Sequence, residues 1–253
     1  MAKEKIFVQK KGLVYLFITI IFLFLSYSIC LFFNESTVVK LTGEDGLFET
    51  LSAIFFLLVS VSFFYLFFKS KSGNNFYFYR TRKNVLFLLL AFMFLFAFGE
   101  EISWGQRIFS FETPKALKNI NLQGEFNIHN IDIFHTTDPA GNRKSIAGLL
   151  LNLDRIFSLF WLSWCVIIPV LSKLHKRFCN WLKEVGVPII PIWLGFLFIS
   201  NYLLSKVGEL FISSANLPNN PLVEIKEYNF AFLFFLVCIY CFKEVSIDIR
   251  QYG

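Results

Sequence analysis

The chain has 253 residues, of which 56% are hydrophobic and 17% are charged, and phenylalanine alone occupies 35 positions. Soluble domains average about 45–50% apolar and about 25% charged residues, so this composition excludes an ordinary soluble domain and predicts a helical membrane protein. The net charge of +6 does not require a nucleic acid partner, because basic loops on the cytoplasmic face of a membrane protein account for it.

Six apolar segments are candidates for membrane spans. They cover about residues 12–33, 47–68, 85–103, 147–171, 187–207 and 228–242. A helix needs about 20 apolar residues to cross a hydrocarbon core of about 30 Å. The last segment is short, and we expect its helix to extend outward through residues 224–229. We therefore predict an all-α polytopic bundle of about six spans, forming a single integral membrane domain over residues 1–253.

The lysine and arginine residues predict the orientation of this bundle. Fifteen of them fall at the N-terminus, in the loops 69–83 and 172–186, and in the C-terminal tail, against about eight on the opposite side. Loops rich in lysine and arginine stay in the cytoplasm. We therefore expect a multi-pass protein of the plasma membrane with both termini in the cytoplasm and a long outer loop over residues 104–146.

On this topology nearly all the acidic residues fall on the outer side. Glu44, Asp45 and Glu49 open the second span, Glu100 and Glu101 close the third, Glu209 ends the fifth, and Glu224 and Glu227 open the sixth. Helix capping is an alternative explanation for Glu44 or Asp45 and for one of Glu224 and Glu227. Because separate helices bring carboxylates to one depth, the sequence predicts a polar site near the outer leaflet.

The third span ends in the motif GEEISWGQR at residues 99–107, after fourteen residues without a charge. A charged side chain at membrane depth costs about 3 kcal/mol on insertion scales, so this pair of carboxylates needs a partner or a function. The i, i+4, i+7 spacing of Glu100, Trp104 and Arg107 predicts that the three share one helical face. The alternative to a functional site is a structural ion pair between helix ends that involves Arg107.

The segment 121–130 alternates polar and apolar residues. Asn121, Gln123, Glu125, Asn127 and His129 occupy its odd positions. An extended chain would place all of them on one face, and a helix would bring Glu125 and His129 together at i, i+4. A solvated outer loop is the third alternative.

A divalent metal ion is one possible cofactor. Glu100, Glu125 and His129 have suitable ligand atoms for zinc or a similar ion with an open water position. The sequence contains no HExxH motif, so these ligands would have to come from separate segments.

GEEISWGQRIF, the following Thr113-Pro114, NLQGEFNIHN and EDGLFETLSA together resemble a family of bacterial multi-pass membrane proteins that has no assigned activity. This resemblance covers about residues 43–130 and implies a shared architecture in the bacterial inner membrane. The pair of glutamates is also similar to that of the glutamate-dependent intramembrane proteases related to CAAX-processing enzymes. Those enzymes carry Glu-Glu-x-x-x-Arg and histidines on later spans, whereas Arg107 here follows Glu101 by six residues and no later span contains a histidine.

We therefore expect a membrane-embedded enzyme that hydrolyses, or transfers a group on, a lipid-linked or membrane-anchored substrate. In this hypothesis Glu100 or Glu101 is the general base, His129 with Glu125 is the acid or a metal ligand, and Arg107 holds an anionic headgroup or an oxyanion. We expect supporting roles for Glu49, Trp104, Gln123, Asn127, Glu209, Glu224 and Glu227.

Two other classes of function remain open. An ion- or proton-coupled transporter or channel would use the acidic residues, the proline-broken fifth span and a Lys206–Glu209 pair. Against it, the cytoplasmic halves of the spans consist almost entirely of Phe, Leu, Ile and Val. A non-catalytic membrane subunit would instead bind a partner through its outer loop.

Overall fold

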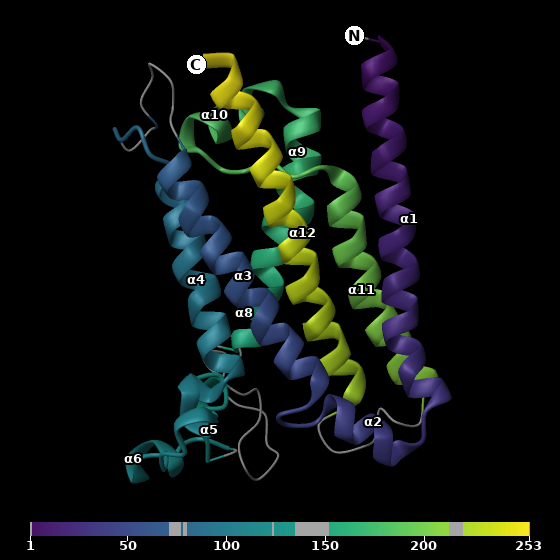
Figure 1. Cartoon of the computed structure of the whole chain (residues 1–253), viewed down its shortest axis with the longest axis vertical. Helices are drawn as coiled ribbons and strands as arrows, with labels where there is room; N and C mark the ends of the chain where they lie inside the picture. The colour runs from purple at the N-terminus through teal and green to yellow at the C-terminus, as the bar shows by residue number, and fades with distance from the viewer. Residues whose placement is uncertain are drawn as a thin grey trace.

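The computed structural model is a bundle of long helices whose axes run roughly parallel (Figure 1). The structure describes residues 2–70, 77, 80–122, 124–134, 152–212 and 220–252, and the side chains of 2–11, 107 and 244–252 are outside this description. The described residues contain no β-strand, only a single bridge between Asn121 and Ile131. The prediction of an all-α fold is confirmed.

Each predicted span overlaps a helix. The long helices are α1 (Ala2–Phe32), α3 (Leu47–Lys69), α4 (Val85–Glu101), α8 (Leu153–Trp161), α11 (Ile192–Phe211) and α12 (Pro221–Tyr252). Helix α8 continues through the π-helix η3 (Leu162–Ile167) into α9 (Ile168–Leu174). Among the described residues, three stretches are long and apolar enough to cross a membrane: Gly12–Phe32, Glu35–Lys69 and Leu153–Leu174.

The shorter elements connect these helices at the two ends of the bundle. They are α2 (Glu35–Thr42), η1 (Ser103–Gly105), α5 (Gln106–Phe109), α6 (Lys115–Lys118), η2 (Asp132–Phe134) and α10 (Lys176–Val185). Both chain termini and α10 lie at one end, and α2, α5 and α6 lie at the other (Figure 1). Four short elements thus interrupt the predicted outer loop 104–146, of which residues 135–146 lie outside the described residues.

Two helix boundaries lie beside the predicted polar site. Helix α4 ends at Glu101 instead of continuing to residue 103. Helix α12 begins at Pro221, so the expected extension through residues 224–229 is helical. Its first turn is capped by Asn220, whose Oδ1 accepts a hydrogen bond from the Leu222 N–H at 3.2 Å. This cap replaces the one that we expected from Glu224 or Glu227.

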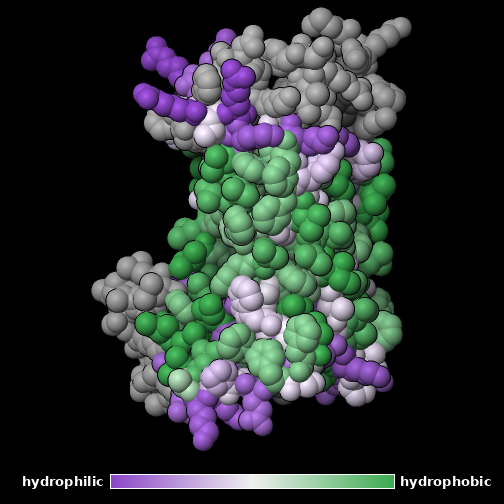
Figure 2. Space-filling view, turned by 60° about the vertical axis from the view of Figure 1, so that its left-hand side comes forward, coloured by the Kyte–Doolittle hydropathy of each residue, from purple (hydrophilic) through white to green (hydrophobic). Residues whose placement is uncertain are grey.

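Aromatic side chains fill the interior of the bundle. Phe63, Phe94, Phe198, Phe230 and Phe234 are fully buried. The ring of Phe94 stacks on Phe63 at a centroid distance of 5.9 Å and lies 4.9 Å from the ring of Phe234. Hydrophobic residues also cover the middle of the molecular face in Figure 2, with hydrophilic residues at both ends. A helical bundle that is apolar both inside and outside is typical of a membrane environment.

A small polar network joins α1, α11 and α12 inside the bundle. The Tyr27 hydroxyl donates to Asn201 Oδ1 at 2.8 Å, and Asn201 Nδ2 donates to the carbonyl oxygen of Lys226 at 2.9 Å. Asn229 Nδ2 donates to Ser26 Oγ at 2.9 Å. Because polar groups at this depth need protein partners, the network fixes the position of α12, which carries Glu224 and Glu227.

Candidate functional site

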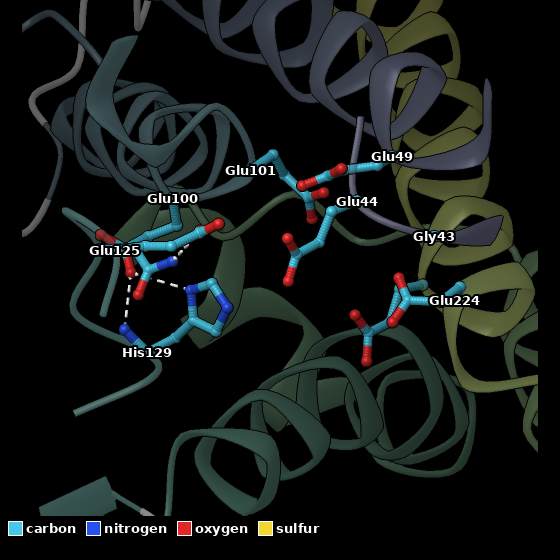
Figure 3. Close-up of a pocket in the computed structure, with 10 residues that line it drawn as sticks. Gly43, Glu44, Glu49, Glu100, Glu101, Glu125, His129 and Glu224 are labelled. Atoms are coloured by element: carbon cyan, nitrogen blue, oxygen red, sulfur yellow. Dashed lines mark hydrogen bonds and ion pairs between the residues drawn. The ribbon is translucent and has the colours of Figure 1, made fainter. Parts of the chain in front are cut away.

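The carboxylates that follow α4 lie in a pocket at the end of the bundle opposite the termini. This acidic pocket has a volume of about 90 Å³. Its lining comprises seven glutamates and three other residues: Glu44, Glu49, Glu100, Glu101, Glu125, Glu224, Glu227, Gly43, Asn127 and His129. Figure 3 shows these side chains converging from the end of α4, the start of α3, the start of α12 and the loop around residue 129.

The chain turns sharply where α4 ends. Ser103, Trp104 and Gly105 all have left-handed backbone conformations, with φ of 46°, 51° and 81°. This turn brings the Trp104 ring against Gly99, where an added Cβ would meet three ring atoms at 3.0 Å. The predicted shared helical face of Glu100, Trp104 and Arg107 is therefore wrong. Trp104 reaches Glu100 through the turn instead, and the Arg107 side chain lies outside the described residues.

Four hydrogen bonds hold the Glu100 carboxylate. Trp104 Nε1 donates to Oε1, and the backbone N–H groups of Ile128 and His129 donate to Oε2, each at 2.7 Å. The His129 ring contacts the same oxygen through Nδ1 at 3.1 Å. Glu100 is 7% exposed, so this buried carboxylate fixes both the loop and the orientation of the His129 ring.

The segment 121–131 is neither extended nor helical. It forms a compact loop, closed by a hydrogen bond from the Leu122 N–H to the Asn130 carbonyl at 2.8 Å. Asn121 donates to Asn127 Oδ1 at 2.8 Å, and Asn127 donates to Glu125 Oε2 at 3.0 Å. The loop asparagines therefore serve mainly as scaffold, and both Glu125 and His129 line the acidic pocket. Gln123 lies outside the described residues.

The turn after α4 and this loop are joined by two further hydrogen bonds. Ser103 Oγ donates to Glu125 Oε2 at 2.7 Å, and the Phe126 N–H donates to Gln106 Oε1 at 2.6 Å. Ser103 is 1% exposed. This role of Ser103 and Gln106 was not predicted from the sequence, because their partners are 22 and 20 residues away along the chain.

The remaining carboxylates approach from α3 and α12. Gly46 is the N-cap of α3 and makes no side-chain bond, so neither Glu44 nor Asp45 caps the helix as expected. The Glu49 carboxylate instead accepts a hydrogen bond from the Asp45 N–H. In Figure 3 the carboxylates of Glu49 and Glu101 point toward each other.

Glu209 is not among the residues that line the acidic pocket. Its carboxylate pairs with Lys206 Nζ at 2.8 Å within α11. The supporting role that we expected for Glu209 therefore has no counterpart in the geometry of the pocket. The same Lys206–Glu209 pair was one reason for considering a transporter, and it is an ordinary i, i+3 pair.

The acidic pocket concentrates negative charge. No lysine or arginine is among its ten lining residues. Carboxylates this close repel one another, so protons or a bound cation must offset part of their charge. Partial burial alone lowers the pKa of His129, but the hydrogen bond and the charge of Glu100 outweigh this effect and raise that pKa above its ordinary value of 6.5.

The predicted metal ligands make hydrogen bonds with the protein. Glu100 Oε2 contacts His129, and Glu125 Oε2 accepts hydrogen bonds from Ser103 and Asn127. Within the part of the chain that the structure describes, no three His, Cys, Asp or Glu side chains are arranged to hold a metal ion. Glu100, Glu125 and His129 thus share a pocket without forming a ligand cluster.

A second cavity of about 200 Å³ adjoins the acidic pocket. The two share Glu100, Glu101, His129 and Glu227. Most of the other lining residues of this adjoining cavity are apolar or aromatic: Phe56, Ala97, Leu153, Phe157, Tyr202 and Phe230, together with Asp154, Ser158 and Lys226. Neither Asp154 nor Lys226 is among the site residues that the sequence predicts, although both lie within one or two turns of a predicted outer helix end.

No protein family, curated protein or solved structure was found to match this chain. Its function is therefore inferred from the geometry of the site.

Proposed function

We propose that this protein is a six-span enzyme of the bacterial plasma membrane that hydrolyses, or transfers a group on, a lipid-linked or membrane-anchored substrate. The observation that carries the proposal is the convergence of seven glutamates and His129 in one pocket beside an apolar cavity. Perturbed acidic and basic groups beside an apolar cavity are typical of active sites.

The arrangement of the helices supports the proposed topology. Both termini lie at the end opposite the acidic pocket (Figure 1), and the basic loops predict that this end is cytoplasmic. Helix α10 also lies there, with Trp181 half exposed and stacked near Phe178 at 5.9 Å. Its lysine and arginine residues and its exposed aromatic side chain are typical of a helix at the membrane interface. The acidic pocket then faces the outer leaflet.

In the proposed reaction His129 transfers the proton. Its Nδ1 contacts Glu100, and Figure 3 shows the other ring nitrogen directed into the acidic pocket. That nitrogen accepts a proton from water or a substrate hydroxyl, or returns one to the leaving group. A histidine whose second nitrogen is held by a carboxylate is well suited to this role.

The two glutamates of the motif have different roles in this mechanism. Glu100 is a positioning residue, because its four hydrogen bonds occupy both oxygens. Glu101 accepts no hydrogen bond from any residue that the structure describes, and it lines both cavities. We therefore assign the second acid–base role to Glu101 and not to Glu100.

The test uses the purified protein in vesicles made from a bacterial polar lipid extract, with lipid conversion followed by mass spectrometry. We expect the wild type to convert one lipid species with time. Removal of an acid–base group costs about 10²- to 10⁴-fold in rate, so His129→Gln and Glu101→Gln should lose most of the conversion. Glu209→Gln is the matched control and should keep the wild-type rate, because Glu209 lies outside both cavities.

Absence of conversion by the wild type in lipid extract and with membrane-anchored peptides would contradict the proposal. Equal rates for wild type and His129→Gln would contradict the assigned mechanism.

A transporter is the second candidate, favoured by the charge of the acidic pocket. Its difficulty is the core beneath the pocket, where Phe56, Phe94 and Phe234 are buried side by side. A conduction path needs polar groups through the whole thickness of the membrane. Proton or cation flux into vesicles that ceases in Glu101→Gln, without any lipid conversion, would favour this candidate.

A further inference from the structure

An apolar groove follows the seam between α4 and the α8–η3 helix. It has a volume of about 670 Å³ and is lined by residues of both helices and by Val187 and Pro188. Leu89 on one wall and Leu159 on the other are 59% and 64% exposed. The groove therefore opens on the side of the bundle, at the depth where lipid chains surround a membrane protein.

The groove leads toward the adjoining cavity. Met93 of α4 lines the groove, and Ala97, one turn later on the same face, lines the adjoining cavity. On the other wall, Ile156 lines the groove and Phe157 lines the cavity. From Leu86 to Ala97 the seam is about 16 Å long, because a helix rises about 1.5 Å per residue.

Three chemical environments thus follow one another along the molecule. The groove is apolar, the adjoining cavity combines an apolar wall with one lysine, Lys226, and four carboxylates, and the acidic pocket is lined by carboxylates without a lysine or arginine. Lys226 Nζ lies 3.8 Å from Glu227 Oε1 and leaves donors for a further anion. The lining thus changes from apolar, through a mixture of one lysine and four carboxylates, to acidic.

We infer that this seam binds a zwitterionic aminophospholipid, with one hydrocarbon chain in the groove, the phosphate near Lys226 and the ammonium group in the acidic pocket. The inference rests on the proposed function and names its substrate class. The hydrocarbon chain of such a lipid matches the apolar groove, its phosphate pairs with Lys226, and its ammonium group pairs with the carboxylates of the two polar cavities. The ammonium group also supplies the positive charge that the acidic pocket requires.

The hydrocarbon chain enters from the side at little cost. Moving it from the bilayer into the groove exchanges one apolar environment for another, so no apolar surface has to leave water. Affinity then depends on the headgroup, whose ammonium is a charge-assisted donor to carboxylates. An anionic lipid without an amine would meet only repulsion in the acidic pocket.

The test is native mass spectrometry of the full-length protein released from nanodiscs. The discs contain equal amounts of phosphatidylglycerol, phosphatidylethanolamine and N-acetylated phosphatidylethanolamine with identical chains. We expect one retained phosphatidylethanolamine per protein, preferred over the other two lipids by about tenfold or more, which corresponds to about 1.4 kcal/mol. Acetylation converts the ammonium group to a neutral amide and leaves the phosphate and the hydrocarbon chains unchanged, so it tests the contribution of the ammonium group.

Two variants block the path of the chain. Ala97→Trp fills the junction between groove and cavity, and Met93→Trp fills the groove one turn away; both should lose the preference. Leu88→Trp lies on the same helix but lines neither space, and it should keep the wild-type preference. If Ala97→Trp fails to fold, Met93→Trp supplies the same test. Lys226→Gln should weaken the retention of phosphatidylethanolamine. The variant protein should still elute from size-exclusion chromatography like the wild type.

The binding experiment separates this inference from the proposed function. Equal retention of the three lipids, or an unchanged preference in both blocking variants, would overturn the inference. Selective retention of phosphatidylethanolamine without turnover by the wild type would support the lipid site and contradict the proposed enzymatic function. Turnover of a substrate without an amine, with no selective retention of phosphatidylethanolamine, would support the enzyme and overturn the lipid site.

Discussion

Glu100 and Glu101 are adjacent in sequence but have opposite environments. Glu100 is buried under four donors, whereas Glu101 faces Glu49, Glu224 and Glu227 across the acidic pocket. The difference arises because successive helical residues point about 100° apart, so one carboxylate meets the loop and the other meets the bundle. In the proposed mechanism, the doubled glutamate would thereby supply a positioning group, Glu100, and an acid–base group, Glu101.

The pairing of Glu100 with His129 predicts a measurable titration. Glu100→Gln removes the negative charge that raises the pKa of His129, so that pKa should fall below its wild-type value. The chain has three histidines, which makes ¹⁵N-histidine labelling and NMR practical. His175, which lies at the other end of the bundle, is the internal control, and its resonances should be unaffected by the substitution. An unchanged His129 titration in Glu100→Gln would contradict the pairing.

The same pair makes stability depend on pH in one direction. Because the pKa of His129 is higher in the folded protein than in the unfolded chain, the pair stabilises the fold fully below the ordinary value of 6.5. That stabilisation is lost as the pH rises through the folded pKa. The difference in melting temperature between wild type and His129→Gln should accordingly shrink on going from acidic to alkaline pH, in detergent micelles of fixed composition.

At the scale of elements, the junction between α4 and the loop 121–131 determines the geometry of the site. Helix α4 stops because Ser103 and Trp104 adopt left-handed conformations that non-glycine residues rarely take. Their cost is offset by the packing of Trp104 on Gly99 and by the Ser103–Glu125 hydrogen bond. The helix end is thus a consequence of tertiary contacts.

Gly99→Ala tests this junction. Replacing glycine by alanine inside a helix normally adds up to about 1 kcal/mol of stability. Here the new methyl group would meet the Trp104 ring at 3.0 Å, and such overpacking costs about 1–3 kcal/mol. We expect a lower melting temperature and a weakened Trp104–Glu100 contact.

The control for this substitution is Gly12→Ala. The nearest atom to an added Cβ there is Trp193 Nε1, at 3.8 Å, so this variant should match or exceed the stability of the wild type. Equal melting temperatures of Gly99→Ala and Gly12→Ala would show that Trp104 does not pack on Gly99 as described.

Part of this architecture was predictable from the sequence and part was not. Apolar runs such as residues 47–68 predict helices, because a polar backbone in lipid must satisfy its own hydrogen bonds. The clustering of Glu49, Glu101 and Glu224 followed from helix ends at one depth. By contrast, the loop 121–131 folds its asparagines inward, and its alternating pattern imitated a strand because local periodicity carries no information about distant partners such as Glu100.

At the scale of the whole molecule, the described helices place the acidic pocket at one end of the bundle and the chain termini and α10 at the other. The buried aromatic core around Phe63 and Phe94 separates the two ends. An enzyme that acts on a lipid at the acidic pocket would need no path through this core. The architecture therefore favours chemistry on a lipid over transport across the membrane.

The orientation of the bundle is the last prediction. In a Cys179→Ser background the other four cysteines are buried, so a single introduced cysteine reports its own side. Lys115 and Lys176 are both exposed and lie at opposite ends of the bundle. We expect a membrane-impermeant maleimide to label Lys115→Cys in intact cells and Lys176→Cys only after permeabilisation. The reverse pattern would place the acidic pocket at the cytoplasmic leaflet. The proposed lipid substrate would then have to be drawn from that leaflet, and the basic loops would be on the outer face, against the rule from which the topology was derived.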